Sequence, residues 1–88
     1  MQVLINKQFL KELAVVPLRD RKRIETFVFS DIPTYSNLAE IPGIRKLKGY
    51  TQHYRIRLGD CRIGVTYQNE TLSLERLLHR KDIYKYFP

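Results

Sequence analysis

Three arginines stand close together in the segment YRIRLGDCRIGVTY, residues 54–67. Arg55 and Arg57 precede a Gly-Asp pair and Arg62 follows it. Alternate residues of a strand point to the same face, so we expect the three guanidinium groups to share one surface. Like charges opposite each other on a sheet are destabilising, and a bound anion relieves their repulsion. Because guanidinium groups present planar, forked donors, the anion that this pattern favours is a phosphate.

The Gly59-Asp60 pair predicts a two-residue hairpin turn of type II′, with glycine at the first central position. This turn sets the register of the two strands, with Arg57 opposite Arg62 and Arg55 opposite Gly64. The arginines then lie on one face of the hairpin. The apolar residues of both strands lie on the other face: Ile56, Leu58, Cys61, Ile63 and Val65.

Further basic residues flank the hairpin. Lys46 and Lys48 precede it and are expected to extend the basic surface, while Arg80 and Lys81 follow the last strand. His79 is a candidate general acid or base, although a lone histidine is more often structural. The alternative for the arginines is a solvated hairpin face, with charges balanced by nearby carboxylates.

Tyrosines near this charge are candidates to stack on unpaired bases, and the alternative for them is packing in the core. They stand at positions 50, 54, 84 and 86. Arginine, lysine, histidine and tyrosine suit phosphodiester cleavage in which the 2′-hydroxyl of the substrate attacks the phosphorus. Cations stabilise the crowded phosphorane, and a side chain protonates the leaving oxygen. Two histidines and one cysteine show no metal-ligand spacing.

The net charge of +7 is concentrated in the second half of the chain. Residues 1–43 hold six Lys or Arg against five Asp or Glu, whereas residues 44–88 hold ten against four. Such a surface attracts polyanions, of which nucleic acid is the commonest, and an acidic protein partner fits the same field. No apolar run approaches the length of a membrane span, and charge appears too early for a secretory signal, so we expect a cytoplasmic protein.

The first half of the chain predicts a strand followed by a helical hairpin. Residues 1–6 form the candidate strand, and Asn6 is the expected N-cap of a helix over residues 7–17. A second helix is expected over residues 18–33. The expected buried positions are Phe9, Leu10 and Leu13 in the first helix and Ile24, Phe27, Val28 and Ile32 in the second.

The second half predicts a loop and then a run of strands. After a loop over residues 33–43, a short strand over residues 44–50 directs Lys46 and Lys48 to the face opposite Arg45. The hairpin follows, and then a strand over residues 72–80 whose alternation is blurred, so that the face of Arg76 stays open. The last residues form either one docked turn or a mobile tail. The expected fold is a single α+β domain over residues 1–88, with the helices on one face of an antiparallel sheet and the arginine face uncovered.

The segments RKLKGYTQHYRIRLGDCRIGVTY and LLHRKDIY resemble the RelE/ParE superfamily of bacterial toxins, and most closely its RelE-like branch of mRNA interferases. The resemblance covers the whole chain. It implies the toxin of a toxin–antitoxin pair, which enters the ribosomal A site and cleaves mRNA by attack of the 2′-hydroxyl, without a metal or other cofactor. It also implies a cognate antitoxin as partner, and a toxin–antitoxin hetero-oligomer as one form of the complex.

The resemblance also implies roles for individual residues. Arg55 and Arg57 match catalytic basic positions, Arg62 matches the arginine that stabilises the phosphate, and Arg80 matches the arginine before the C-terminal helix. Tyr84 matches the tyrosine that stacks on the nucleotide or assists proton transfer. Lys46, Lys48 and Lys81 are the implied RNA-binding residues.

The best-known members of the family carry lysines where this chain has Arg55 and Arg57. Arginine hardly gives up a proton, so the general base stays open and His79 is a candidate. Two alternatives remain at this point. One is a ParE-like toxin that inhibits DNA gyrase without cleaving RNA, and the other is an inactive homologue that only binds an antitoxin. The arginine cluster favours RNA cleavage.

Overall fold

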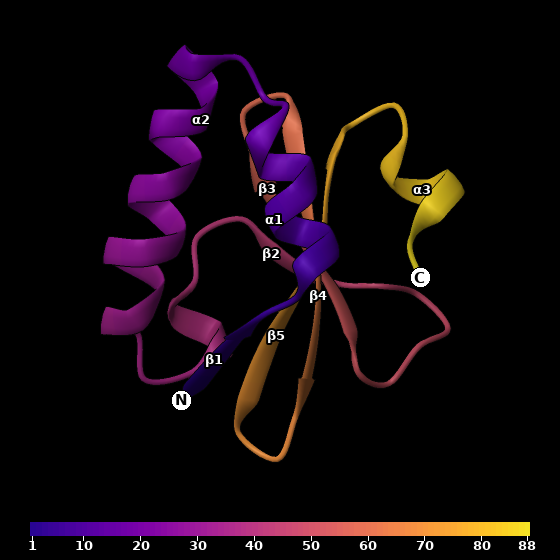
Figure 1. Ribbon diagram of the computed structural model, residues 1–88. Helices are drawn as coiled ribbons and strands as arrows, with labels where there is room; N and C mark the ends of the chain where they lie inside the picture. The colour runs from indigo at the N-terminus through magenta and orange to yellow at the C-terminus, as the bar shows by residue number, and fades with distance from the viewer.

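The computed structural model describes residues 1–88 and contains a five-stranded sheet with helices on both of its faces (Figure 1). The strands lie in the order β1-β5-β4-β3-β2. In chain order the elements are β1 (Gln2–Ile5), α1 (Lys7–Ala14), α2 (Leu18–Glu25), β2 (Ile44–Lys46), β3 (His53–Leu58), β4 (Cys61–Gln68), β5 (Thr71–His79) and α3 (Ile83–Tyr86). The α+β class is therefore confirmed.

The first strand corrects the expectation of a purely antiparallel sheet. β1 pairs in parallel with β5, from Gln2 opposite Thr71 to Ile5 opposite Leu74, while the other strand pairs are antiparallel. The meander from β2 to β5 leaves one edge of β5 uncovered, and β1 satisfies its backbone groups. Residue alternation predicts which segments are strands, but it contains no information about the direction of a distant partner.

The helical hairpin is confirmed and covers one face of the sheet (Figure 1). The Asn6 side chain accepts a hydrogen bond of 2.8 Å from the backbone N–H of Gln8, as expected of an N-cap. α1 ends at Ala14, before Pro17, whereas the second helix continues from α2 through a π turn (Thr26–Asp31) and a 3-10 turn (Ile32–Thr34). The expected apolar positions are buried except Leu10, which lies on the solvent side of α1 and is 44% exposed.

The hairpin of β3 and β4 has the predicted register. Arg57 lies opposite Arg62, and Arg55 lies opposite Gly64. Gly59 has a φ of +60°, the left-handed conformation that the first central position of a type II′ turn requires. Ile56, Ile63 and Val65 face the helices and are completely buried there, while the arginines face the opposite side of the sheet.

A β-bulge explains the blurred alternation of the last strand. Val65 lies opposite Leu74 and Gly64 lies opposite Arg76, so Glu75 is the additional residue of β5. The bulge allows both Leu74 and Leu77 to face the main core. It also decides the face of Arg76, which lies on the same side of the sheet as the hairpin arginines.

The arginine face is not wholly uncovered, which corrects the second part of the fold prediction. Ile83 and Phe87 pack there with Leu47 and Leu78 in a separate small core, and this fixes the C-terminal segment as a docked turn. The Phe87 ring lies directly on Gly64, so close that a Cβ atom at this position would come within 2.6 Å of the ring. The remainder of the face, toward β2 and the β3–β4 turn, stays open.

Replacing Gly64 by alanine should therefore loosen the C-terminal turn. The backbone of Gly64 is not in the left-handed region, so the cost comes from the Phe87 ring and should be about 1–3 kcal/mol, as for overpacking elsewhere. Urea unfolding of Gly64→Ala measures it. In a Phe87→Ala background the same substitution should cost far less, since the ring is absent. Equal costs in both backgrounds would contradict this explanation.

Candidate functional site

Four arginines line one concavity on the open part of the sheet. The concavity has a volume of about 400 Å³ and is lined by Gly43, Arg45, Arg55, Arg57 and Arg62. We refer to it as the arginine concavity. No carboxylate lines it, so the positive charges are not neutralised within the site. An anion with several oxygen atoms is the ligand that this arrangement favours.

Arg45 is the member of this group that sequence reasoning did not select. It lies opposite Arg55 in the pairing of β2 with β3. The alternation of residues 44–50 already directed Arg45 to the face opposite Lys46, and this pattern could have identified Arg45 as a member of the cluster. Gly43 allows the close approach of β2 to β3. Its carbonyl oxygen accepts a 3.0 Å hydrogen bond from the Arg57 N–H, and a Cβ atom at position 43 would lie only 2.7 Å from the Arg57 carbonyl oxygen.

Arg62 is the most constrained of the cluster. Its Nη1 atom donates to the carbonyl oxygens of Gly59 at 2.8 Å and Cys61 at 2.9 Å, which holds the guanidinium against the turn. Partial burial, and then the charges of Arg57, Arg55 and Arg80, lower the pKa of Arg62. The neighbouring cations repel the charged form of the Arg62 guanidinium, and a bound phosphate would stabilise that form instead.

The C-terminal turn brings Tyr84 and Arg80 toward the cluster. The guanidinium carbon of Arg55 lies 5.9 Å from the centre of the Tyr84 ring, within the range of a cation–π contact. The rest of Tyr84 is exposed. Arg80 is anchored through its backbone N–H to the Asp60 carbonyl at 2.8 Å, and its charge is felt by Arg62. The structure therefore brings Arg55, Arg57, Arg62, Arg80 and Tyr84 into one neighbourhood.

The structure separates His79 from this cluster. His79 lies opposite Cys61, a residue that packs against the core beneath the helices, so its side chain is directed to the other face of the sheet. There its Nδ1 atom accepts a 3.1 Å hydrogen bond from the backbone N–H of Lys81. The geometry gives no support to His79 as the general base.

The two lysines before the hairpin also lie apart from the arginine concavity. Lys46 lies opposite Tyr54, which packs against the main core, so Lys46 is on the helix side at the edge of the sheet. Lys48 follows the end of β2. Both line a separate hollow of about 390 Å³ formed by residues 46–51.

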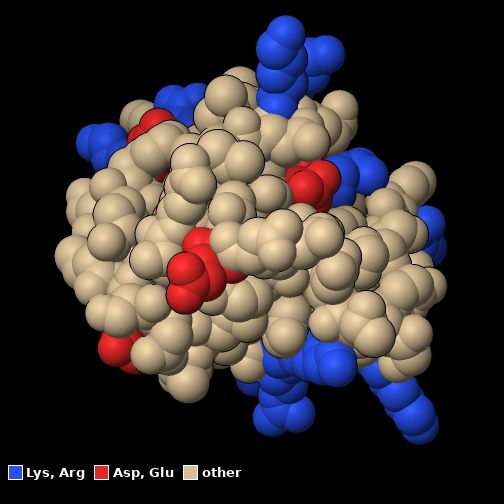
Figure 2. Space-filling model, turned by 90° about the horizontal axis from the view of Figure 1, so that it is seen from below, with Lys and Arg blue, Asp and Glu red and all other residues tan.

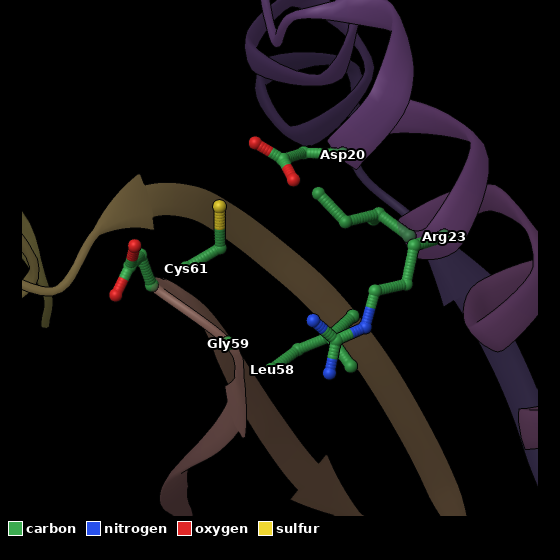
Figure 3. Close-up of a pocket in the computed structure, with 7 residues that line it drawn as sticks. Asp20, Arg23, Leu58, Gly59 and Cys61 are labelled. Carbon is green, nitrogen blue, oxygen red and sulfur yellow. The ribbon is translucent and has the colours of Figure 1, made fainter.

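A different hollow lies where α2 meets the β3–β4 turn, and Figure 3 shows it. The Arg23 guanidinium lies beside Leu58 and Gly59, while Asp20 and Cys61 lie on the other side (Figure 3). Burial, followed by the charges of Asp20 and Asp60, raises the pKa of the Cys61 thiol. A thiol held in its neutral form is a poor nucleophile, and the mixed charges do not suit an anion.

The face seen in Figure 2 carries few charges at its centre. Uncharged side chains form most of that centre, with a few acidic groups among them, while Lys and Arg side chains project around the rim. No group of three or more His, Cys, Asp or Glu side chains is arranged to hold a metal ion. None of the helices has the length and hydropathy of a membrane span.

An ion pair joins α1 to the edge of β5 and to the C-terminal turn. The Glu12 Oε2 atom lies 2.8 Å from the Arg76 Nη2 atom. Glu12 also accepts a 2.9 Å hydrogen bond from the backbone N–H of Leu77, which lies just beyond the part of β5 that pairs with β1. Arg76 in turn donates to the carbonyl oxygen of Tyr86 at 3.2 Å. Burial opposes ionisation of Glu12, but the hydrogen bonds from Arg76 and Leu77 outweigh it, and the pKa of Glu12 is lowered.

The fold and the arginine concavity together define a small basic α+β domain that presents unpaired arginines on one face of a sheet. The toxin RelE3 of Methanocaldococcus jannaschii is 43% identical to this chain over 89 residues, and the match spans 100% of both proteins. The chain therefore belongs to the RelE family of toxins, and the resemblance stated from its sequence is confirmed.

Solved structures share the fold of this chain. The crystal structure of the RelB–RelE antitoxin–toxin complex from Methanococcus jannaschii contains a chain 41% identical to this one, with a TM-score of 0.77 and coverage of 97% of this chain and 99% of that one. The isolated RelE toxin of E. coli shares the fold, with a TM-score of 0.64 at 17% identity, over 96% of this chain and 90% of that one. No family model matches the sequence.

Replacing Glu12 by glutamine should destabilise the protein at neutral pH by about 1.5–3 kcal/mol, the usual contribution of hydrogen bonds to a charged group. Since the pKa of Glu12 is lowered on folding, its contribution is present above the ordinary value of 4.5 and is lost as the pH falls through the lower folded value. Urea unfolding of wild type and Glu12→Gln should therefore converge in acid. Glu25→Gln, at a helix carboxylate without an ion pair, is the control and should change little. A difference between wild type and Glu12→Gln that persists in strong acid would contradict the assignment.

Proposed function

We propose that this chain is the toxin of a toxin–antitoxin pair and an endoribonuclease that cleaves mRNA on the ribosome by attack of the 2′-hydroxyl. The observation that carries the proposal is that Arg55, Arg57 and Arg62 line one concavity without a carboxylate. Family membership supports it, as does the naming of the M. jannaschii relative as a toxin. In this proposal the protein acts on ribosomes and is therefore cytoplasmic.

In this proposal the cleaved phosphate lies between Arg57 and Arg62, which are opposite each other on the hairpin. The 2′-oxygen forms a bond to phosphorus while the bond to the 5′-oxygen breaks, so that a 2′,3′-cyclic phosphate and a 5′-hydroxyl result. Negative charge grows on the non-bridging oxygens, and the guanidinium groups donate hydrogen bonds to it. Donors already held in place stabilise such a transition state most effectively, and the two turn carbonyls hold Arg62 in that way.

The remaining site residues have supporting roles. In this proposal Tyr84, whose ring lies against Arg55, stacks on a base or protonates the leaving 5′-oxygen. Arg80 adds positive charge. Because His79 faces the other side of the sheet, we assign it no part in the reaction, and acceptance of the 2′-proton falls to a group outside the arginine cluster. The mechanism uses no metal ion or cofactor. Lys46, Lys48 and Lys81 contribute contacts to RNA phosphates outside the concavity.

The proposed partner is an antitoxin with an acidic or amphipathic segment. The second half of the chain holds ten Lys or Arg against four Asp or Glu, and complementary charge favours rapid and specific association. The M. jannaschii complex, in which a RelE pairs with a RelB, supports such a partner for this chain.

Primer extension on a reporter mRNA after brief induction tests the nuclease directly. Wild type should give discrete new 5′ ends within the translated region. Arg62→Ala should reduce cleavage by about 10²–10³-fold, as loss of a transition-state donor does elsewhere. Arg19→Ala removes an exposed arginine from α2 and should cleave like wild type. Growth arrest with intact mRNA would contradict the nuclease and favour a toxin that acts on another target, such as DNA gyrase.

A further inference from the structure

The loop between β2 and β3 presents an aromatic ring that other rings hold in place. Tyr50 is 47% exposed, and its ring lies edge-on to His53 with the ring centres 5.2 Å apart. His53 in turn lies 5.6 Å from the buried ring of Phe87, which rests on Gly64. A half-exposed tyrosine ring that a neighbouring ring holds in place is a ready surface for stacking.

The surroundings of Tyr50 are basic. The hollow that it lines is formed by Lys46, Leu47, Lys48, Gly49, Tyr50 and Thr51, and contains no carboxylate. Two lysines that line the same hollow as an aromatic ring provide the two elements that bind single-stranded nucleic acid, namely positive charge for the backbone and a π surface for the base.

The position of this surface connects it to the arginine concavity. His53, Arg55 and Arg57 are alternate residues of β3 and lie on one face, so the path from His53 to Arg57 measures about 13 Å at the usual rise of a strand. A strand of RNA with its phosphate at Arg57 therefore needs only a short extended stretch to reach Tyr50.

We propose that Tyr50, backed by His53 and flanked by Lys46 and Lys48, is a stacking site for an unpaired nucleobase close to the phosphate that the arginines hold. The inference rests on the proposed function. Its ligand is an unpaired nucleotide, which on a ribosome has two sources, the mRNA that is cleaved and the ribosomal RNA. Stacking of this kind tolerates every base, so the site adds affinity rather than sequence preference.

Cleavage of mRNA on purified ribosomes, with the A site vacant and the toxin below saturation, tests the site. Tyr50→Ala should lower the rate roughly 5- to 150-fold, the range expected for loss of one base–aromatic stack. Tyr50→Phe keeps the ring and should cleave like wild type. Phe29→Ala removes a ring of similar exposure, 48%, from the helix side of the molecule and should also cleave like wild type. Thermal unfolding verifies that each variant is folded.

An abasic site in the mRNA identifies the source of the base. The base is removed in turn at each nucleotide flanking the cleaved phosphate. If Tyr50 stacks on an mRNA base, one abasic position slows wild type but slows Tyr50→Ala no further. If Tyr50→Ala is slow and no abasic position couples to it, the base belongs to ribosomal RNA. A Tyr50→Ala protein as fast as wild type, or a Tyr50→Phe protein as slow as Tyr50→Ala, would overturn the stacking site.

Failure of the proposed function gives a different result, since wild type itself then leaves the mRNA intact. In that case binding of a labelled single-stranded RNA hexamer at low salt, followed by fluorescence anisotropy, tests the stacking site alone. Tyr50→Ala should weaken binding and Tyr50→Phe should not. Equal binding by wild type and Tyr50→Ala would overturn the site independently of any cleavage.

Discussion

The register of the β3–β4 hairpin is the constraint on which the rest of the structure depends. The Gly59-Asp60 turn aligns Arg57 with Arg62, and the same alignment directs Ile56 and Ile63 into the core. A slip of one residue in this register would move the apolar side chains of the hairpin to solvent and the arginines beneath the helices. The same register therefore determines both the burial of the core and the assembly of the site. Hydrophobic packing on the opposite face therefore keeps the arginines close together despite their mutual repulsion.

The C-terminal turn depends on contacts that are distant in sequence. Phe87 occupies the space that a side chain at position 64 would need, and Arg76 donates to the carbonyl oxygen of Tyr86 while Glu12 holds its guanidinium from α1. A helix as short as α3 does not form by itself in water, and these contacts determine where Tyr84 and Arg80 lie. The site is thus assembled from the hairpin, which carries its charge, and from a turn that both ends of the chain help to position.

Much of the fold and of the candidate site was predictable from patterns of neighbouring residues in the sequence. Alternation and a recognisable turn were enough to place Arg55, Arg57 and Arg62 on one face, because strand periodicity and turn geometry are properties of neighbouring residues. Three features depended on distant contacts and were not predictable in that way. They are the parallel direction of β1, the docking of Phe87 on Gly64, and the orientation of His79 away from the arginines, which follows from its pairing with Cys61. The bulge at Glu75 concealed the face of Arg76, since one inserted residue reverses the alternation.

The ion pair of Glu12 with Arg76 also gives the basic face a direction. Arg76 is on the same side of the sheet as the hairpin arginines, but its charge is compensated by a carboxylate from α1. The charge of Arg76, on the β5 side of this face, is therefore balanced by a carboxylate, whereas Arg45, on the β2 edge, has no ion-pair partner. Under the proposed function, a flexible polyanion is therefore attracted more strongly to the β2–β3 side of this face than to the Arg76 side, and a bound strand extends along the β2–β3 edge.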